Sequence, residues 1–230
     1  MENTVRLLST LALMGAVRSL AGKYEAEGGA RIDADFAPTL RLLDRLRDGE
    51  AADVVILTRE GLAGLAAKGS VVAESCVDLA SSFVGLAVKA GETHPDIATE
   101  AALRKTLLRA RSIAYSRLGA SGIFFAQLIA QMGIAVEIDA RATIVPQGFT
   151  AERLVSGEAD LAVQQISELK QVAGVDIVGS IPLHLQSAAV FSAGRLSASG
   201  KIDQSDRLLK FLASAEVVPA LRESGLAPAA

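Results

Sequence analysis

The chain has 230 residues, half of them hydrophobic, which allows one large domain or two small ones with a sizeable core. Its formal net charge of −3 argues against nucleic acid as a partner, because duplex binding requires a concentrated positive face. Cys76 is the single cysteine, so an internal disulfide is excluded.

The first third of the chain alternates strand-like apolar runs with helical patterns. Pro38 opens one of these helices, and Thr39 is predicted to be its N-cap. The run at 53–57 is continuously apolar, which is typical of a strand buried in a parallel sheet. The predicted strands are 5–8, 31–36 and 53–57, and the predicted helices are 12–26, 39–48 and 60–68.

A long apolar strand over residues 78–89 breaks this rhythm and is predicted to carry the chain from one lobe to another. A second series of strands and helices follows, and residues 186–192 are predicted to return the chain to the first lobe. The strands of the second series are predicted at 112–115, 142–145, 161–165 and 175–181, its helices at 99–110, 121–132 and 149–156, and two final helices at 205–213 and 215–223.

This alternation predicts an α/β fold with two Rossmann-like lobes, whose parallel-rich sheets are joined by a two-strand hinge. Lobe 1 is predicted to contain residues 1–80 plus 190–230, and lobe 2 residues 81–189. The cleft between such lobes is the default position for a ligand.

The N-terminal stretch 5–17 is apolar enough to suggest a secretory signal. Glu2 stands where a signal has a basic region, however, Arg6 interrupts the apolar run, and no small-residue cleavage pattern follows. We therefore expect the chain as written to work in the cytoplasm, or in the periplasm if its Met replaces a removed leader. No apolar stretch approaches the length that spans a bilayer.

Three motifs, in order along the chain, resemble type 2 periplasmic solute-binding proteins, and the molybdate-binding branch in particular. They are GEAADVVI at 49–56, LAAKGSV at 65–71 and GEADL at 157–161. A narrower resemblance rests on QQISEL at 164–169, on Ala114-Tyr115 and on GASG at 119–122. It indicates a signal-free branch related to the bacterial aconitate isomerases, which share the two-lobed fold.

The resemblance implies an anion held by hydroxyls and by backbone N–H groups at helix N-termini, where unpaired donors and the helix dipole favour negative charge. In lobe 1, Ser9 and Thr10 resemble the family's first hydroxyl contact, and Thr39 matches a serine at the second helix start. The alternative is that these hydroxyls only cap their helices.

In lobe 2, the resemblance places backbone contacts at Ser121 with Gly122 and at Gln147 with Gly148. Gln165 stands where the molybdate-binding proteins have an anion-binding tyrosine. Because an amide is both donor and acceptor, the two glutamines favour an organic acid. The alternative is that they are strand-end groups facing solvent.

Tyr115 ends a strand at the predicted cleft, and Arg117 follows it closely. The planar guanidinium of Arg117 would suit a carboxylate, although the residue equally fits a solvated loop. Two distant histidines and one cysteine give no metal-ligand spacing, and no nucleotide-binding glycine motif is present, so neither a metal nor a cofactor is expected.

The main hypothesis is a monomeric solute-binding protein of the ABC-transporter type, which captures a small oxyanion or a di- or tricarboxylate and serves an ABC permease. The second is an isomerase of the aconitate type, for which Tyr115 and His184 are the candidate proton-transfer residues. The third is a cytoplasmic ligand sensor.

Overall fold

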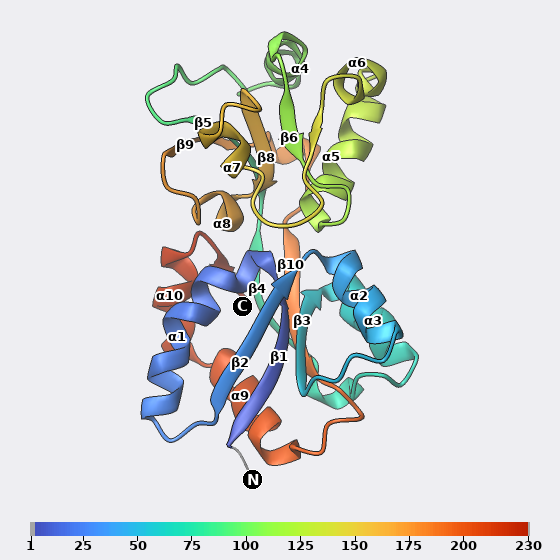
Figure 1. The fold of residues 1–230 in the computed structure, drawn as a ribbon, viewed down its shortest axis with the longest axis vertical. Helices are drawn as coiled ribbons and strands as arrows, with labels where there is room; N and C mark the ends of the chain where they lie inside the picture. The colour runs from blue at the N-terminus through green and yellow to red at the C-terminus, as the bar shows by residue number, and fades with distance from the viewer. Residues whose placement is uncertain (1–2, 230) are drawn as a thin grey trace. The chain divides into compact units, whose positions relative to one another are not determined.

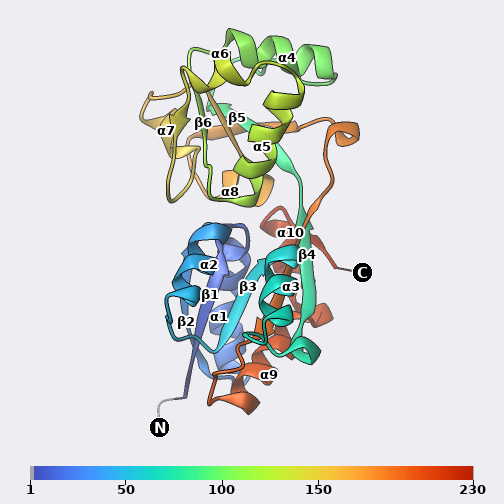
Figure 2. The same ribbon diagram turned by 90° about the vertical axis from the view of Figure 1, so that its right-hand side faces the viewer.

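Two mixed β-sheets form the framework of the protein in this computed structural model, which describes residues 3–229 (Figures 1 and 2). Each sheet belongs to a separate compact unit. Unit 1 contains the residues up to Ser81 together with those from Ala189 onward, and unit 2 contains Ser82–Ala188. The chain therefore passes twice between the units.

The sheet of unit 1 has the strand order β11-β4-β10-β3-β1-β2. The central strand β1 runs parallel to both β2 and β3, so the carboxyl ends of these three strands lie at one edge of the sheet. The strands β10 and β11 pair antiparallel to β3 and β4. The bounds are β1 Thr4–Thr10, β2 Arg31–Ala37, β3 Val54–Thr58, β4 Val77–Ser82, β10 Ala189–Arg195 and β11 Ala227–Pro228.

Helices cover both faces of this sheet, which explains its continuous apolar strands. Val5 and Leu7 of β1 pack in the cluster that includes α1, α9 and α10, whereas Leu8 packs on the other face in the cluster that includes α2 and α3. The helices are α1 Met14–Ala26, α2 Thr39–Arg47, α3 Arg59–Ala67, α9 Ile202–Leu212 and α10 Val218–Glu223, with single 3-10 turns η1 Leu11–Leu13, η2 Ala73–Ser75 and η4 Ala215–Val217.

The sheet of unit 2 has the order β7-β6-β8-β5-β9, in which β6 runs parallel to β7 and β8. The strands are β5 Val84–Lys89, β6 Ile113–Tyr115, β7 Thr143–Ile144, β8 Leu161–Gln165 and β9 Val175–Ser180. The helices are α4 Glu100–Arg109, α5 Ala120–Gln131, α6 Ala135–Asp139, α7 Glu152–Val155 and α8 Ile166–Leu169, with the 3-10 turn η3 Leu183–Leu185. Within the described residues, no helix combines the length and the apolar composition needed to cross a bilayer.

The predicted fold class is confirmed, with three corrections in detail. The long strand predicted at 78–89 is two strands, because the chain leaves the first sheet after Ser82 and enters the second at Val84. The returning strand begins at Ala189 rather than at 186, since the Gln186 amide hydrogen-bonds the backbone of Val84 instead. Thr39 is not an N-cap: Pro38 holds that position, and Thr39 is the first helical residue.

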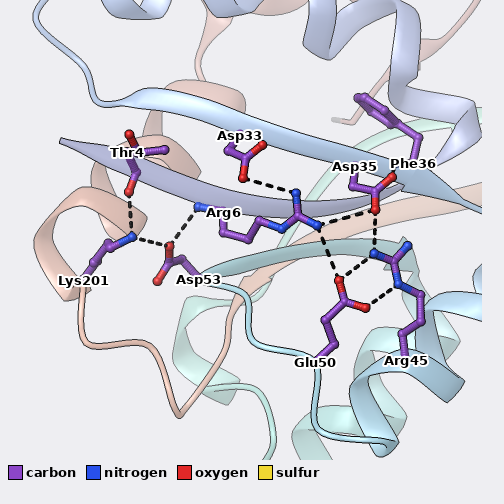
Figure 3. A network of polar contacts seen from close by, with 9 residues as sticks. All are labelled: Thr4, Arg6, Asp33, Asp35, Phe36, Arg45, Glu50, Asp53 and Lys201. Carbon is purple, nitrogen blue, oxygen red and sulfur yellow. Dashed lines mark hydrogen bonds and ion pairs between the residues drawn. The ribbon is translucent and has the colours of Figure 1, made fainter. Parts of the chain in front are cut away.

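A network of charges ties α2 to the sheet of unit 1 (Figure 3). Arg45 of α2 donates to Asp35 of β2 at 2.5 Å and to both oxygens of Glu50 at 2.5 Å and 2.6 Å. Arg6 of β1 reaches the same two carboxylates. The hydrogen bond from Arg45 holds the pKa of Glu50 below its usual value. These contacts join α2 to β2 and to the loop after α2, while the buried Leu42 packs α2 against the sheet.

Asp53 fastens the C-terminal part of unit 1 to its sheet (Figure 3). Its buried carboxylate accepts the Arg6 N–H at 2.8 Å, the Ser199 hydroxyl at 2.7 Å and the Lys201 ammonium at 3.2 Å. Burial alone would raise the pKa of Asp53, but these three donors together outweigh it and hold the pKa below its usual value. The ionised carboxylate is therefore the form that stabilises the fold.

Replacing Asp53 with Asn should lower the free energy of unfolding by about 1–3 kcal/mol at pH 7, because donors to a charged acceptor lose their stronger bonds. A native pKa below the unfolded value gives stability that is present above the unfolded pKa, which is 3.8 for a free Asp, and that is lost as the pH falls through the native pKa. Denaturant unfolding of the wild type and of Asp53→Asn should show a difference in the free energy of unfolding that becomes smaller toward pH 3. A gap of constant size from pH 7 to pH 3 would contradict this assignment.

Candidate functional site

Three threonines mark the edge of unit 1 at which the parallel strands end. Thr10 is the last residue of β1, Thr39 follows β2 by two residues, and Thr58 is the last residue of β3. A helical segment begins directly after each strand end, and its first N–H groups have no intrahelical acceptor. We call this set, Thr10, Thr39 and Thr58 with the helix starts beside them, the unit 1 edge.

The hydroxyl of Thr10 is buried and has no hydrogen-bond partner within residues 3–229. The residue is only 3% exposed, and its side chain does not cap the turn that follows. Leaving a buried polar group unpaired costs about 1–3 kcal/mol, so each such group requires an explanation. Ser9 differs, because its hydroxyl donates to the carbonyl oxygen of Thr10 at 3.0 Å. Of the two predicted contacts, Thr10 is the one with an unused hydroxyl.

Thr39 and Thr58 lie close together beside Gly61 of α3. A Cβ atom on Gly61 would lie 3.2 Å from Thr58 Oγ1 and 3.6 Å from Thr39 Cγ2. Thr58 Oγ1 accepts the Gly61 N–H at 3.3 Å, and Thr39, the first residue of α2, is only 6% exposed. Thr58 was not predicted as a site residue, although it shows the same signal as Thr10, a hydroxyl where an apolar strand meets a helix.

The corresponding edge of unit 2 begins at the N-terminus of α5. The N–H groups of Ala120 and Ser121, at the start of this helix, have no intrahelical acceptor. Gly119 is the N-cap and has no side chain that could accept a hydrogen bond from them. A Cβ atom on Gly122 would lie 1.5 Å from the carbonyl oxygen of Ser116. Only glycine permits this approach, which brings the predicted contacts Ser121 and Gly122 against the end of β6. We call this helix start, with the ends of β7 and β8, the unit 2 edge.

Gln164 of β8 organises the loop that follows β7. Its Oε1 accepts the Thr150 N–H at 2.8 Å and the Thr150 hydroxyl at 3.0 Å, and its Nε2 donates to the carbonyl oxygen of Gly148 at 3.3 Å. Gly148 has a positive φ of 86°, which favours glycine. Gln147 is exposed in this loop. The predicted contacts Gln147 and Gly148 therefore lie in a loop that Gln164 holds in place.

Gln165 is 2% exposed, and its side chain is occupied within unit 2. Its amide donates to the carbonyl oxygens of Ser82 and Phe83, both at 3.2 Å, and it forms a capping box with Glu168. These bonds fix the end of β8 to the segment where the chain enters unit 2. A contact between Gln165 and a ligand stays a prediction.

Tyr115 and Arg117 form a cluster with Asp139 at the end of α6. The buried Tyr115 hydroxyl donates to the Asp139 carboxylate, and Arg117 Nη2 lies 3.1 Å from the same oxygen. Burial and the bond to Asp139 both raise the pKa of Tyr115, so this phenol keeps its proton at neutral pH. His184 is exposed in η3. The guanidinium of Arg117 already has a carboxylate partner in unit 2.

Glu168 is a polar residue of the unit 2 edge. It belongs to the QQISEL motif but was not predicted as a site residue. It is 7% exposed, and its Oε2 accepts the backbone N–H of Gln165 at 3.2 Å. Burial raises the pKa of its carboxyl group to about 8. The burial of α8 is a tertiary effect, since that helix has only four residues and no amphipathic pattern of its own.

Two hollows lie within single units and contain none of the predicted contacts. One of about 600 Å³ in unit 2 is bordered by α4 and by the loop after β5, with Lys89, Lys105 and Arg109 in its lining. The other, of about 940 Å³, lies between α2 and α3 of unit 1 and is lined by Leu40, Leu43 and Leu65 among others. Neither is lined by Thr10, Thr39 or Thr58, although the hollow in unit 1 reaches Gly61 in the first turn of α3.

A family model for bacterial extracellular solute-binding proteins matches residues 5–227. A relative named aconitate isomerase, from a Pseudomonas species, is 36% identical over an alignment of 231 residues that covers 98% of this chain and 88% of that protein. Among solved structures, the periplasmic molybdate-binding protein of Azotobacter vinelandii has a TM-score of 0.81 at 16% identity and covers 96% of this chain and 98% of its own. The tungstate-binding protein of Desulfovibrio alaskensis has a TM-score of 0.69 at 14% identity, with 99% of both chains covered. At these identities the solved structures establish the fold alone.

Replacing Gly122 with Ala should lower the free energy of unfolding by about 2–4 kcal/mol, because the new methyl group collides with backbone that cannot move aside easily. Gly64 of α3 provides the matched control, since a Cβ atom there would meet nothing within 4 Å. Gly64→Ala should be neutral or stabilise the protein by up to about 1 kcal/mol. Equal effects of the two substitutions in urea unfolding would show that the close approach at Ser116 is absent.

Proposed function

The chain belongs to the bacterial extracellular solute-binding protein family, and we propose that it binds a small polycarboxylate at the unit 1 and unit 2 edges. The observation that carries this proposal is the buried, unpartnered hydroxyl of Thr10. A ligand oxygen at the end of β1 would satisfy this hydroxyl. The same oxygen would be stabilised by the positive end of the helices that begin there.

The chemistry of the two edges supports an anion held mainly by neutral donors. Unit 1 offers the hydroxyls of Thr10 and Thr39, and unit 2 offers the free N–H groups at the start of α5. Arg117 has Asp139 as its partner, so it is not available as a lone cation. Donors without formal charge bind an anion and still allow its release, which a solute-binding protein requires.

We propose a carboxylate rather than an inorganic oxyanion because of the similarity to the protein named aconitate isomerase. The relative that aligns over 98% of the chain is named for aconitate, a tricarboxylate, whereas the molybdate- and tungstate-binding structures share only 14–16% of their residues with it. A tricarboxylate also has several separate oxygens, each of which can accept a hydrogen bond from a hydroxyl or from a backbone N–H group.

Turnover of this ligand is the second candidate function, and the 36% identity to aconitate isomerase favours it. Moving the double bond of aconitate requires removal of a proton next to a carboxylate and its return elsewhere on the same allylic system. The negative charge that develops on the carboxylate would be stabilised by N–H groups at a helix start. A receptor would instead release the ligand unchanged to an ABC permease outside the cytoplasm.

Replacing Thr10 with Val should weaken the binding of trans-aconitate by about tenfold or more, because the isosteric side chain removes one donor to a charged oxygen. The same substitution should leave the free energy of unfolding unchanged or slightly raised, because it also removes an unpaired buried hydroxyl. Titration calorimetry and urea unfolding measure the two effects.

Thr150→Val is the matched control, because the Thr150 hydroxyl is equally buried but bonds to Gln164 and to the carbonyl oxygen of Val163. It should destabilise the protein by about 1–2 kcal/mol. Unchanged affinity in Thr10→Val would remove the main support for the proposal.

Incubation with trans-aconitate, followed by proton NMR, tests turnover. The isomerase candidate predicts that cis-aconitate accumulates at a rate proportional to protein concentration. Binding without any conversion at high protein concentration would leave the receptor function alone.

A further inference from the structure

Glu168 is held inside unit 2 by the close packing of α8 against β5. Gly85 of β5 makes this packing possible, because a Cβ atom there would lie 2.8 Å from Ile166 Cγ1 and 2.8 Å from the carbonyl oxygen of Gly179. The helix therefore lies directly on the strand, and water is excluded from the carboxyl group of Glu168. The buried carboxyl group has two hydrogen-bond donors beside it, the backbone N–H of Gln165 and the side chain of Gln164.

Within residues 3–229, Glu168 forms no ion pair with a strand that packs against α8. The strands packed against α8 are β5, β8 and β9, and their charged residues are Lys89 and Asp176. These two lie at the opposite end of the sheet from Gln165, roughly 13 Å away for Asp176 and roughly 17 Å away for Lys89 along the strand at about 3.3 Å per residue. Asp176 there accepts the Gly91 N–H, and Lys170 follows Glu168 at the C-cap of α8. Burial raises the pKa of Glu168 to about 8, with the two hydrogen bonds acting in the opposite direction.

Helix capping alone does not require an acid at this position. The capping box needs only a side-chain acceptor for the Gln165 N–H, and a glutamine supplies one equally well. An acid adds one property that glutamine lacks, the ability to gain and lose a proton. A buried carboxyl group without an ion partner is also costly to ionise.

Glu168 lies beside a residue that organises the unit 2 edge. The Gln164 side chain adjoins the Glu168 carboxyl group, donates to Gly148 and accepts from Thr150. An ionised Glu168 would attract the amide hydrogens of Gln164, which holds this loop. It would also place a negative charge on the unit that receives the anion.

We propose that Glu168 must be protonated when unit 2 binds its anionic ligand, so that binding above neutral pH takes up one proton. This inference rests on the proposed function and adds a regulation to the same site. The balance is one proton gained by the Glu168 carboxylate for each anion bound, and the same proton lost to solvent on release. Because linkage is reciprocal, a bound anion must in turn raise the pKa of Glu168.

The test compares the wild-type protein with Glu168→Gln, which keeps the acceptor for the cap and loses only the titrating proton. Calorimetric titration with trans-aconitate from pH 6 to pH 9.5 should give a wild-type Kd that is constant below neutral pH. Above about pH 8 the wild-type Kd should rise toward tenfold per pH unit, while the Kd of the variant stays level. Titration of the ligand itself affects both proteins equally. Parallel profiles would overturn the proposal.

A second measurement does not depend on the ligand. A carboxyl group whose native pKa exceeds its unfolded value binds more protons in the folded state, so stability falls as the pH rises between the two values. Between about pH 5 and pH 8, the ratio of the wild-type unfolding constant to that of Glu168→Gln should therefore rise by up to tenfold per pH unit. A constant ratio would overturn the proposal. If the wild type binds no trans-aconitate at any pH, the proposed function fails, and this ratio still decides whether Glu168 holds a proton.

Discussion

The convergence of strand ends and helix starts at one edge of a sheet is the constraint on which the account depends. In unit 1, β1 is parallel to both of its neighbours, so Thr10 is flanked by the helix starts that follow β2 and β3. A hydroxyl at this point has helix N-termini beside it and no hydrogen-bond partner in the part of the chain that the structure describes. The salt bridges of Arg45 with Asp35 and Glu50 join α2 to β2 and to the loop after α2, and the buried Leu42 packs the same helix on the sheet. Contacts away from the edge thus accompany the neutral donors on it.

Unit 2 also has an edge at which strand ends meet a helix start, but different residues form it. A glycine at 122 brings the start of α5 against Ser116, and the Gln164 amide replaces side-chain charge as the organiser of the neighbouring loop. Arg117 and Tyr115 were predicted from the sequence as contacts for an anion. In the structure both interact with Asp139. Through the proton of the buried acid Glu168, we expect anion binding at this edge to depend on pH. Affinity in unit 2 therefore depends on amide geometry and on one proton.

Features that arise from local pattern could be predicted from the sequence, and features that arise from tertiary pairing could not. Apolar runs predicted β1, β3 and β8, whereas the resemblance to the solute-binding family pointed to Thr10 and Thr39, whose contact with a ligand stays a prediction. The break at Phe83 was missed because the apolar run continues across it while the chain changes sheets. The burial of Glu168 depends on the distant Gly85, and the pairing of Arg117 depends on Asp139 in another helix. Thr58 shows the same local pattern as Thr10, a hydroxyl where an apolar strand meets a helix, and could have been predicted from the sequence.

Amide hydrogen exchange with and without trans-aconitate tests the central claim most directly. The account predicts that the ligand slows exchange at the first amides after Thr10, Thr39 and Gly119 and in the loop around Gly148, while the amides of α4 and α9 exchange unchanged. Protection centred on the hollow bordered by α4, with none at these strand ends, would contradict the claim that the anion binds at the strand edges.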